Sequence, residues 1–375
     1  MGRVRMAAAV AAAAAVVALG SAGMPAWGDT SSVGSTTVPP PPRVAASAEP
    51  APPLARSYIV VDADTGAVLA ERADHIPRRP ASTIKTLTAL IAETNLPADT
   101  TVLVGADAAG MEAAKINMHA GEVWPLADAL RSLLIVSAND AAVAIGDRVG
   151  GSRAGFAADM AKACQLLGCR DNPTLQDPSG LDDSFSWNGG DLISAWDLAV
   201  VARAAMTVPD LASIVGTPQY EFTGPDGVHH VLRTHDLLLG WDPTAVGIKD
   251  GWTLAAGETL VSEASRGGHH VIVVQLDSTP PSLYPGAEYL LDQGFQNISN
   301  EVGDATLPPV HLPVLDPPAA PPALAVHTAV LRHPAPASGG VPWQAGLVGA
   351  AVVVGGLRYR AVRIRRRRGI GSRRR

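Results

Sequence analysis

Two proline-rich stretches divide the chain and leave one body between them that can form a core. Residues 29–55 are rich in Ser, Thr, Pro and Ala, and residues 299–340 are rich in Pro and Ala. Such segments bury little apolar surface, so each is predicted to be a linker. The body at 56–298 is long enough for one large domain or two closely packed subdomains, and it shows no internal repeat.

The body mixes strand and helix patterns. Strands are predicted at 58–61 and 67–69, around a turn at 64–66, and again at 230–234, 259–264 and 270–275. Helices are predicted at 82–93, 125–136, 141–149, 153–167, 194–206 and 288–294. Strands at both ends with helices between them indicate an α+β fold, in which helices flank one sheet and form an insert.

A serine and a lysine stand three residues apart at the start of the first predicted helix. On a helix, Ser82 and Lys85 would share one face, so the amine can reach the hydroxyl. A desolvated lysine can act as the base that activates a serine nucleophile. The plainer alternative is a helix start, with Ser82 as its cap and Lys85 in solvent.

Two further polar motifs follow along the chain. Ser137-Ala138-Asn139-Asp140 comes directly after the helix predicted at 125–136. Lys249-Asp250-Gly251-Trp252-Thr253 precedes a predicted strand. Each motif alone carries little weight, but S-x-x-K, S-x-N and K-x-G in this order, each at the edge of an element, are unlikely by accident.

With these motifs the body resembles the low-molecular-mass penicillin-binding proteins, the serine D-alanyl-D-alanine carboxypeptidases. The stretch Asp177-Pro178-Ser179-Gly180-Leu181-Asp182 and the pair Ala256-Gly257 match that family as well. The resemblance covers roughly residues 56–298. It implies a β-lactamase/transpeptidase-like fold, with an antiparallel sheet flanked by helices and a mostly helical subdomain.

The resemblance also implies a role for each residue of the first two motifs. Ser82 would attack the carbonyl of the penultimate D-alanine of a stem peptide ending in D-Ala-D-Ala, with Lys85 as its base. Ser137 would relay a proton to the leaving amine, and Asn139 would hold the substrate amide. β-Lactams would acylate the same serine. Repulsion between Lys85 and Lys249, together with burial, would lower the pKa of one lysine and let it accept a proton near neutral pH.

The third motif would supply the substrate-binding edge. Lys249 would add a positive electrostatic potential beside Ser137. Gly251 and Thr253 are expected at the same substrate-binding edge. The backbone N–H groups of Ser82 and Trp252 would form the oxyanion hole.

Two departures from the family pattern bear on the substrate. Asp250 stands where the family has threonine, and the stretch Gln275-Leu276-Asp277-Ser278 carries no arginine where one is expected. Recognition of a free terminal carboxylate is therefore predicted to be weak, leaving Thr253 as a possible contact. The open alternatives are a D,D-endopeptidase and a low-turnover penicillin-binding or peptidoglycan-sensing protein.

Two enzyme alternatives are less favoured. A class A β-lactamase needs a glutamate to activate water, and none occurs between Glu122 and Glu221. A linked transglycosylase would need a second large domain, for which this chain is too short.

The two ends indicate export and anchoring. Residues 1–28 combine a basic start, an apolar run and a small-residue cleavage site, as in a signal peptide, the alternative being an uncleaved anchor. Residues 341–357 are uncharged and would span about 26 Å as a helix. The arginine-rich tail at 358–375 favours the cytoplasmic side, which places the body outside, on the cell-wall side of the membrane. A soluble domain with a nucleic-acid-binding tail is the competing interpretation.

Charge and cysteine content limit other functions. The ends at 1–28 and 341–375 hold 12 of the 29 lysine and arginine residues and none of the 35 acidic ones, so the body is acidic and nucleic-acid binding by it is not expected. Cys164 and Cys169 are either a disulfide around a turn at Gly168 or two free thiols. No metal site and no cofactor are expected.

Overall fold

The computed structural model describes residues 52, 54–182, 186, 188–300 and 305–315. The segments predicted at 1–28, 341–357 and 358–375, and most of both linkers, lie outside the described residues. The described part forms one compact unit that ends at Leu315.

Five antiparallel strands form the central sheet in the order β2-β1-β9-β8-β7. They are β1 Ser57–Asp62, β2 Val68–Arg72, β7 Ala245–Thr253, β8 Gly257–Arg266 and β9 His269–Ser278. The two-stranded sheets pair β3 Thr101–Leu103 with β4 Val123–Pro125, and β5 Gln219–Thr223 with β6 His229–Arg233. The predicted antiparallel sheet is confirmed, but the strand predicted at 230–234 pairs with β5 outside it.

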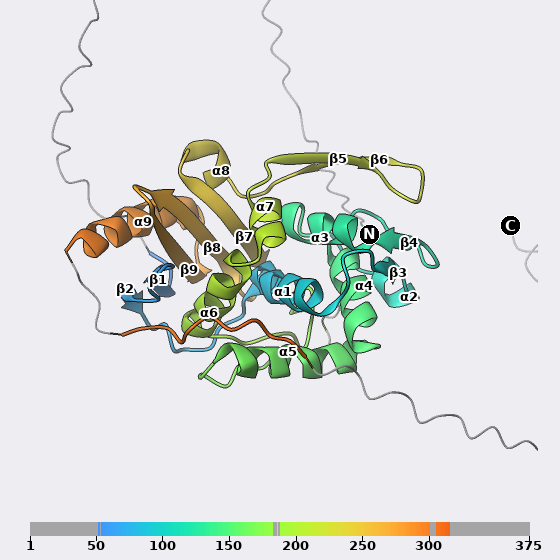
Figure 1. The fold of residues 1–375 in the computed structure, drawn as a ribbon, viewed down its shortest axis with the longest axis horizontal. Coiled ribbons are helices and arrows are strands. Elements are labelled where there is room, and N and C mark those ends of the chain that lie inside the picture. The colour runs from blue at the N-terminus through green and yellow to red at the C-terminus, as the bar shows by residue number, and fades with distance from the viewer. Residues whose placement is uncertain (1–51, 53, 183–185, 187, 301–304, 316–375) are drawn as a thin grey trace, which may run out of the picture. The chain divides into compact units, whose positions relative to one another are not determined.

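Helices cover both faces of this sheet and also form a helical part beside it (Figure 1). A short 3₁₀ helix, η1 Ala81–Ile84, leads directly into α1 Lys85–Asn95. The others are α2 Ala106–Ala109, α3 Leu126–Ile135, α4 Asn139–Gly150, α5 Arg153–Leu167, α6 Ala195–Met206, α7 Pro209–Val215, α8 Leu238–Trp241 and α9 Leu283–Ser299. Among the described residues no single helix is long and apolar enough to cross a bilayer, and the one pair that qualifies, α6 with α7, is bent by 107°.

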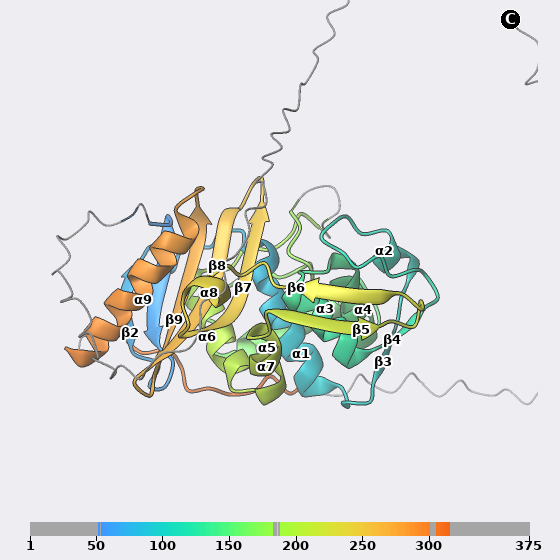
Figure 2. The ribbon, with the colours of Figure 1, turned by 90° about the horizontal axis from the view of Figure 1, so that it is seen from above.

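The alternation of apolar side chains explains the layers. Val60, Val271 and Val273 face α9, whereas Ile59, Val61 and Ile272 face the opposite side, where α6 packs. Figure 2 shows α9 lying along one face of the sheet. At Gly294 of α9 a Cβ would lie 2.7 Å from Val271 Cγ1, so only glycine allows this close packing.

Several elements differ from the predicted boundaries. β7 runs through the third motif, where the sequence indicated only the approach to a strand. The helix predicted at 288–294 extends over 283–299, and α7 and β5 were not predicted. Two glycines, a lysine and an aspartate interrupt the apolar pattern of β7, and pairing with β8 along its length compensates for that weak pattern.

The described residues 305–315 lie against the domain, although they belong to the stretch predicted as a linker. Leu307 is buried, and its N–H donates to Gly66 O at 2.9 Å. Near the end of the segment, Asn95 Nδ2 donates to Pro313 O at 3.0 Å, and Leu315 N donates to Asn95 Oδ1 at 2.7 Å. This segment therefore contacts both the chain just before β2 and the end of α1.

Cys164 and Cys169 form a disulfide, which decides between the two alternatives left open by the sequence. Gly168 adopts φ +91° at the end of α5, the left-handed cap that turns the chain back.

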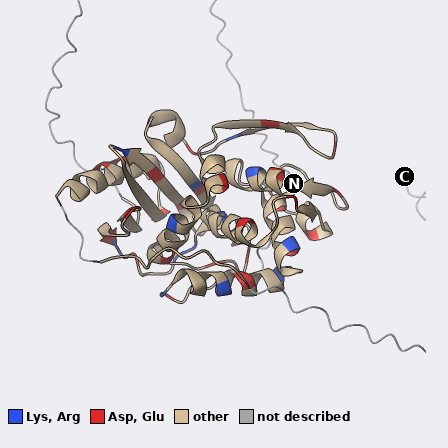
Figure 3. Cartoon of the chain, viewed as in Figure 1, with Lys and Arg blue, Asp and Glu red and all other residues tan. Residues whose placement is uncertain are grey.

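Acidic and basic residues are scattered over the described elements (Figure 3).

Candidate active site

Ser82 lies in the 3₁₀ turn that feeds α1, and Lys85 is the first residue of that helix. Lys85 Nζ is 2.8 Å from Ser82 Oγ, so the structure brings the predicted pair into hydrogen-bond contact. Lys85 is completely buried. The alternative of a solvated lysine is therefore wrong, and no side-chain hydrogen bond caps this helix start.

Three oxygen atoms surround the Lys85 amine, and two of them come from distant parts of the chain. Besides Ser82 Oγ, they are Asn139 Oδ1 at 2.8 Å and the carbonyl of Ser179 at 2.6 Å. Burial, and then the positive charge of Lys249, hold the pKa of Lys85 well below its ordinary value. A buried lysine with a lowered pKa is suited to accept the Ser82 proton near neutral pH.

The stretch 177–182 supplies one of these oxygens, a role that sequence reasoning did not assign. Ser179 N and Oγ both donate to Asp177 Oδ1, which closes a tight turn. Gly180 has φ +78°, and a Cβ there would lie 2.0 Å from Ala81 O. The turn therefore packs directly against the residue that precedes Ser82.

Ser137 lies in the connection between α3 and α4, and Asn139 is the first residue of α4. Asn139 Oδ1 accepts from Lys85, and its Nδ2 donates to Glu112 O at 2.9 Å. Ser137 adopts φ +61° and is only 7% exposed. It lies two residues before Asn139, which contacts Lys85. That Ser137 faces the Ser82–Lys85 pair stays a prediction of the S-x-N motif.

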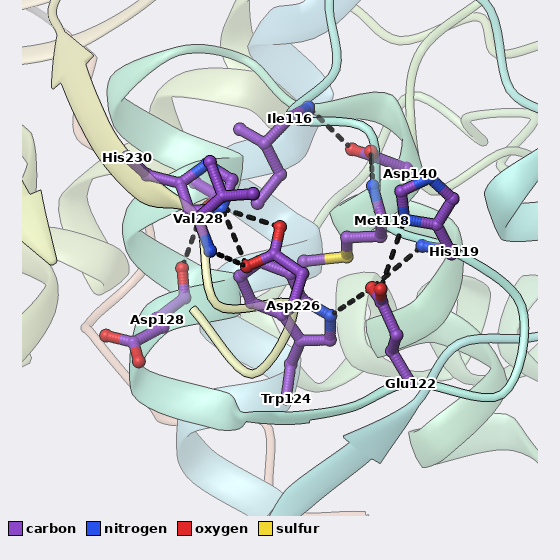
Figure 4. Close-up of polar contacts among 11 residues, drawn as sticks. Ile116, Met118, His119, Glu122, Trp124, Asp128, Asp140, Asp226, Val228 and His230 are labelled. Atoms are coloured by element: carbon purple, nitrogen blue, oxygen red, sulfur yellow. Dashed lines mark hydrogen bonds and ion pairs between the residues drawn. The ribbon is translucent and has the colours of Figure 1, made fainter. Parts of the chain in front are cut away.

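Asp140 fixes the loop that faces this connection. Its carboxylate accepts from Met118 N at 2.9 Å and from Ile116 N at 3.3 Å (Figure 4). The same loop continues to Glu122, which accepts from the Trp124 indole at 3.0 Å. The α3–α4 connection is thus held in place from the outside, independently of Lys85.

The outer edge strand β7 presents the third motif. Lys249 is 1% exposed, and its Nζ donates to Asp250 Oδ1 at 2.8 Å and to Asp250 O at 2.9 Å. Its charge therefore acts on both Lys85 and Asp250. The Lys249 ammonium lowers the pKa of the Asp250 carboxyl, although burial opposes it.

The remaining residues of the motif differ in their surroundings. Gly251 packs against the start of η1, and a Cβ on it would lie 2.7 Å from Ser82 N. Trp252 is 64% exposed, so its side chain borders solvent. Thr253 Oγ1 donates to Asp182 Oδ2 at 2.6 Å, so its hydroxyl proton is already engaged inside the protein.

Two other side-chain contacts hold the residues just before Ser82 in place. Thr259 Oγ1 on β8 donates to Pro80 O at 2.8 Å, and Arg79 lies 4.0 Å from Asp182. No sequence signal pointed to Thr259, because a threonine in a strand is ordinary and its partner lies 179 residues away. No group of residues able to hold a metal ion occurs in the part of the chain that the structure describes.

Comparison with known proteins agrees with this geometry. Residues 44–279 match the D-alanyl-D-alanine carboxypeptidase family of peptidases. The chain therefore belongs to this family, and it is a hydrolase of the serine-type D-Ala-D-Ala carboxypeptidase class.

Individual relatives cover the same body. The D-alanyl-D-alanine carboxypeptidase DacB2 of Mycobacterium tuberculosis is 34% identical over 64% of this chain and 82% of its own length. The crystal structure of an evolved putative penicillin-binding protein homolog from the same organism has a TM-score of 0.64 and 32% identity, and the match covers 70% of this chain and 99% of that one. Penicillin-binding protein D2 from Listeria monocytogenes, solved in its ampicillin-bound form, gives a TM-score of 0.56 at 26% identity, over 64% of this chain and 97% of that one. The predicted fold class is confirmed.

Proposed function

We propose that Ser82 forms the acyl-enzyme through which this carboxypeptidase removes the terminal D-alanine of peptidoglycan stem peptides. The single observation that carries the proposal is the 2.8 Å contact between Ser82 Oγ and the fully buried amine of Lys85. A serine beside a desolvated base is the arrangement that nucleophilic catalysis requires.

The reaction follows from this arrangement. Ser82 Oγ attacks the carbonyl carbon of the penultimate D-alanine, and its proton passes to Lys85 Nζ. The carbonyl C–N bond then breaks, and a proton relayed through Ser137 reaches the leaving amine. Water hydrolyses the resulting ester, which releases the shortened peptide and restores Ser82.

The packing of β7 on η1 supports the assignment of the Ser82 and Trp252 backbone N–H groups as the oxyanion hole. The close approach of Gly251 to Ser82 N brings the two segments together at this point. Two N–H groups aimed at one carbonyl oxygen would stabilise the negative charge that develops on it during attack.

β-Lactams are proposed to acylate the same serine. The ampicillin-bound relative supports this assignment by homology. The test is endpoint labelling of the purified protein by a fluorescent penicillin, beside a Ser82→Ala variant and a pentapeptide assay for released D-alanine. Label or D-alanine release that persists in Ser82→Ala would overturn the proposal.

Export and anchoring are proposed from the sequence of the two ends. A signal peptide at 1–28 and a membrane helix at 341–357 would place the catalytic body on the outer face of the cytoplasmic membrane. The Cys164–Cys169 disulfide supports an oxidising compartment. Protease treatment of intact spheroplasts should degrade the body. A body that stays protected until lysis would contradict this location.

A further inference from the structure

Asp250 occupies the β7 position next to the contact between that strand and the nucleophile. The following residue, Gly251, packs against Ser82 N, and the preceding residue, Lys249, donates to Asp250 Oδ1 at 2.8 Å. The Asp250 side chain is 26% exposed, so part of its carboxylate remains open to a ligand. A negative charge therefore lies on the strand position next to the one that packs against the nucleophile.

The residues around Asp250 add further acceptors. Asp236 is 5% exposed; its Oδ1 accepts from Leu238 N at 2.9 Å, and its Oδ2 has no hydrogen-bond partner. Glu258 lies on β8, opposite Trp252 of β7, and its buried Oε2 also has no partner. Two carboxylate oxygens near this edge of the sheet therefore lack a donor.

The electrostatic effects show that these acidic groups act on each other. Burial, and then Asp250, raise the pKa of Asp236 to about 6, while Lys249 opposes this shift. Burial, and then Asp250 and Asp236, raise the pKa of the Tyr284 hydroxyl. Lys249 and His235 are the basic groups that act on Asp250. The single Lys249 ammonium thus faces two carboxylates.

The β9 stretch contains no arginine of its own, and the arginines that contact it are bound to its aspartate. On β9 the stretch expected to carry an arginine contains Gln275, Asp277 and Ser278. Arg78 contacts Asp277 Oδ2 at 2.6 Å and Arg56 contacts it at 3.9 Å, so Asp277 already partners both guanidinium groups. Asp277 therefore offsets one of these two positive charges, chiefly that of Arg78, which is the closer of the two.

Resting on the function proposed above, we propose that Asp250 determines which leaving residue this enzyme prefers. The favoured leaving residue ends in an uncharged N–H donor, a carboxamide, and not in a free carboxylate. A carboxylate beside Asp250 would meet a like charge, which is costly at a recognition surface. A carboxamide NH₂ would instead donate to Asp250, and its oxygen would accept from the Lys249 ammonium.

The bond chemistry is the same for both substrates. Ser82 Oγ bonds to the carbonyl carbon, the peptide C–N bond breaks, and the amine of D-alanine or of D-alaninamide leaves with one added proton. Only the group at the far end of the leaving residue differs, so the comparison isolates recognition from the reacting atoms.

The test compares two stem peptides that are identical except for a terminal D-alanine or D-alaninamide. We expect wild-type kcat/KM to be at least about tenfold higher for the amide. Asp250→Thr should reverse this preference, and Asp250→Asn should reduce it. Asp99→Asn removes one acidic charge from an exposed position beyond the far end of α1 and should leave the ratio unchanged.

The outcomes separate this inference from the proposed function. A wild-type enzyme that prefers the acid, or an Asp250→Thr variant with an unchanged ratio, would overturn the inference while leaving the Ser82 mechanism intact. Cleavage of either peptide that does not depend on Ser82 would instead refute the proposed function. Melting temperatures of both Asp250 variants serve to exclude unfolding as the cause of a changed rate.

Discussion

A Cβ atom on Gly251 would lie 2.7 Å from the backbone nitrogen of Ser82 and 2.6 Å from Thr259 Oγ1. Gly251→Ala must therefore push β7 away from the nucleophile, and misplacing an oxyanion donor costs about 100-fold or more in rate. We expect penicillin acylation to slow by at least tenfold, because the strand can give way in part. Stopped-flow labelling measures this rate. Gly240→Ala, which meets no neighbouring atom within 4 Å, is the control and should acylate normally.

Replacing Lys85 by methionine should abolish most of the activity while preserving the buried volume. General bases contribute about 10²–10⁴-fold, so we expect the acylation rate to fall at least about a hundredfold. Lys162→Met, at an exposed position on α5, provides the matched control. If the Lys85 variant reacts with penicillin at the wild-type rate, the serine is activated by another group.

The pH profile of acylation should report the charge of Lys249. Acylation requires neutral Lys85, so the rate should rise with pH through the lowered pKa of that amine. Lys249 lowers this pKa and Asp250 raises it. Lys249→Gln removes the first effect and leaves Asp250 without its cation, so both changes move the midpoint to higher pH. The rate constant for acylation, followed across the pH range of wild type and variant, gives the two midpoints. A midpoint that stays in place or moves down would contradict the assignment of Lys85 as the base.

The disulfide should contribute modestly to stability. Cys164 and Cys169 are five residues apart, and closing so short a loop is worth about 2 kcal/mol in the chain-entropy account. The double variant Cys164→Ser/Cys169→Ser should lose about that free energy of unfolding in a denaturant titration. Reductant should lower the stability of the wild type by a similar amount and leave the variant unaffected. Equal sensitivity of both proteins to reductant would argue against this account.

Much of the site was predictable because its residues follow one another closely in short motifs. Ser82 and Lys85 needed only helical spacing, and α3 was placed within one residue at each end. The carbonyl of Ser179 and the hydroxyl of Thr259 were missed because their partners lie 94 and 179 residues away. Contacts of that range depend on how the sheet and the helical part dock, which local patterns do not encode.

Boundaries were predicted less well where tertiary contacts override propensity. The glycines and charged residues of β7 weaken its strand pattern, and pairing with β8 stabilises it nevertheless. Thr253 was expected to be available to substrate, but Asp182 accepts its hydroxyl proton. A carboxylate 71 residues away could not be assigned to that threonine from the sequence.

The segment at 305–315 couples the C-terminal side of the domain mechanically to the catalytic helix. Its last described residue, Leu315, is held by Asn95, which ends the helix that Lys85 begins. A pulling force applied to the chain beyond this point would reach α1 before it reached the sheet. The two hydrogen bonds between Asn95 and this segment would therefore have to break before such tension could separate the segment from the end of α1.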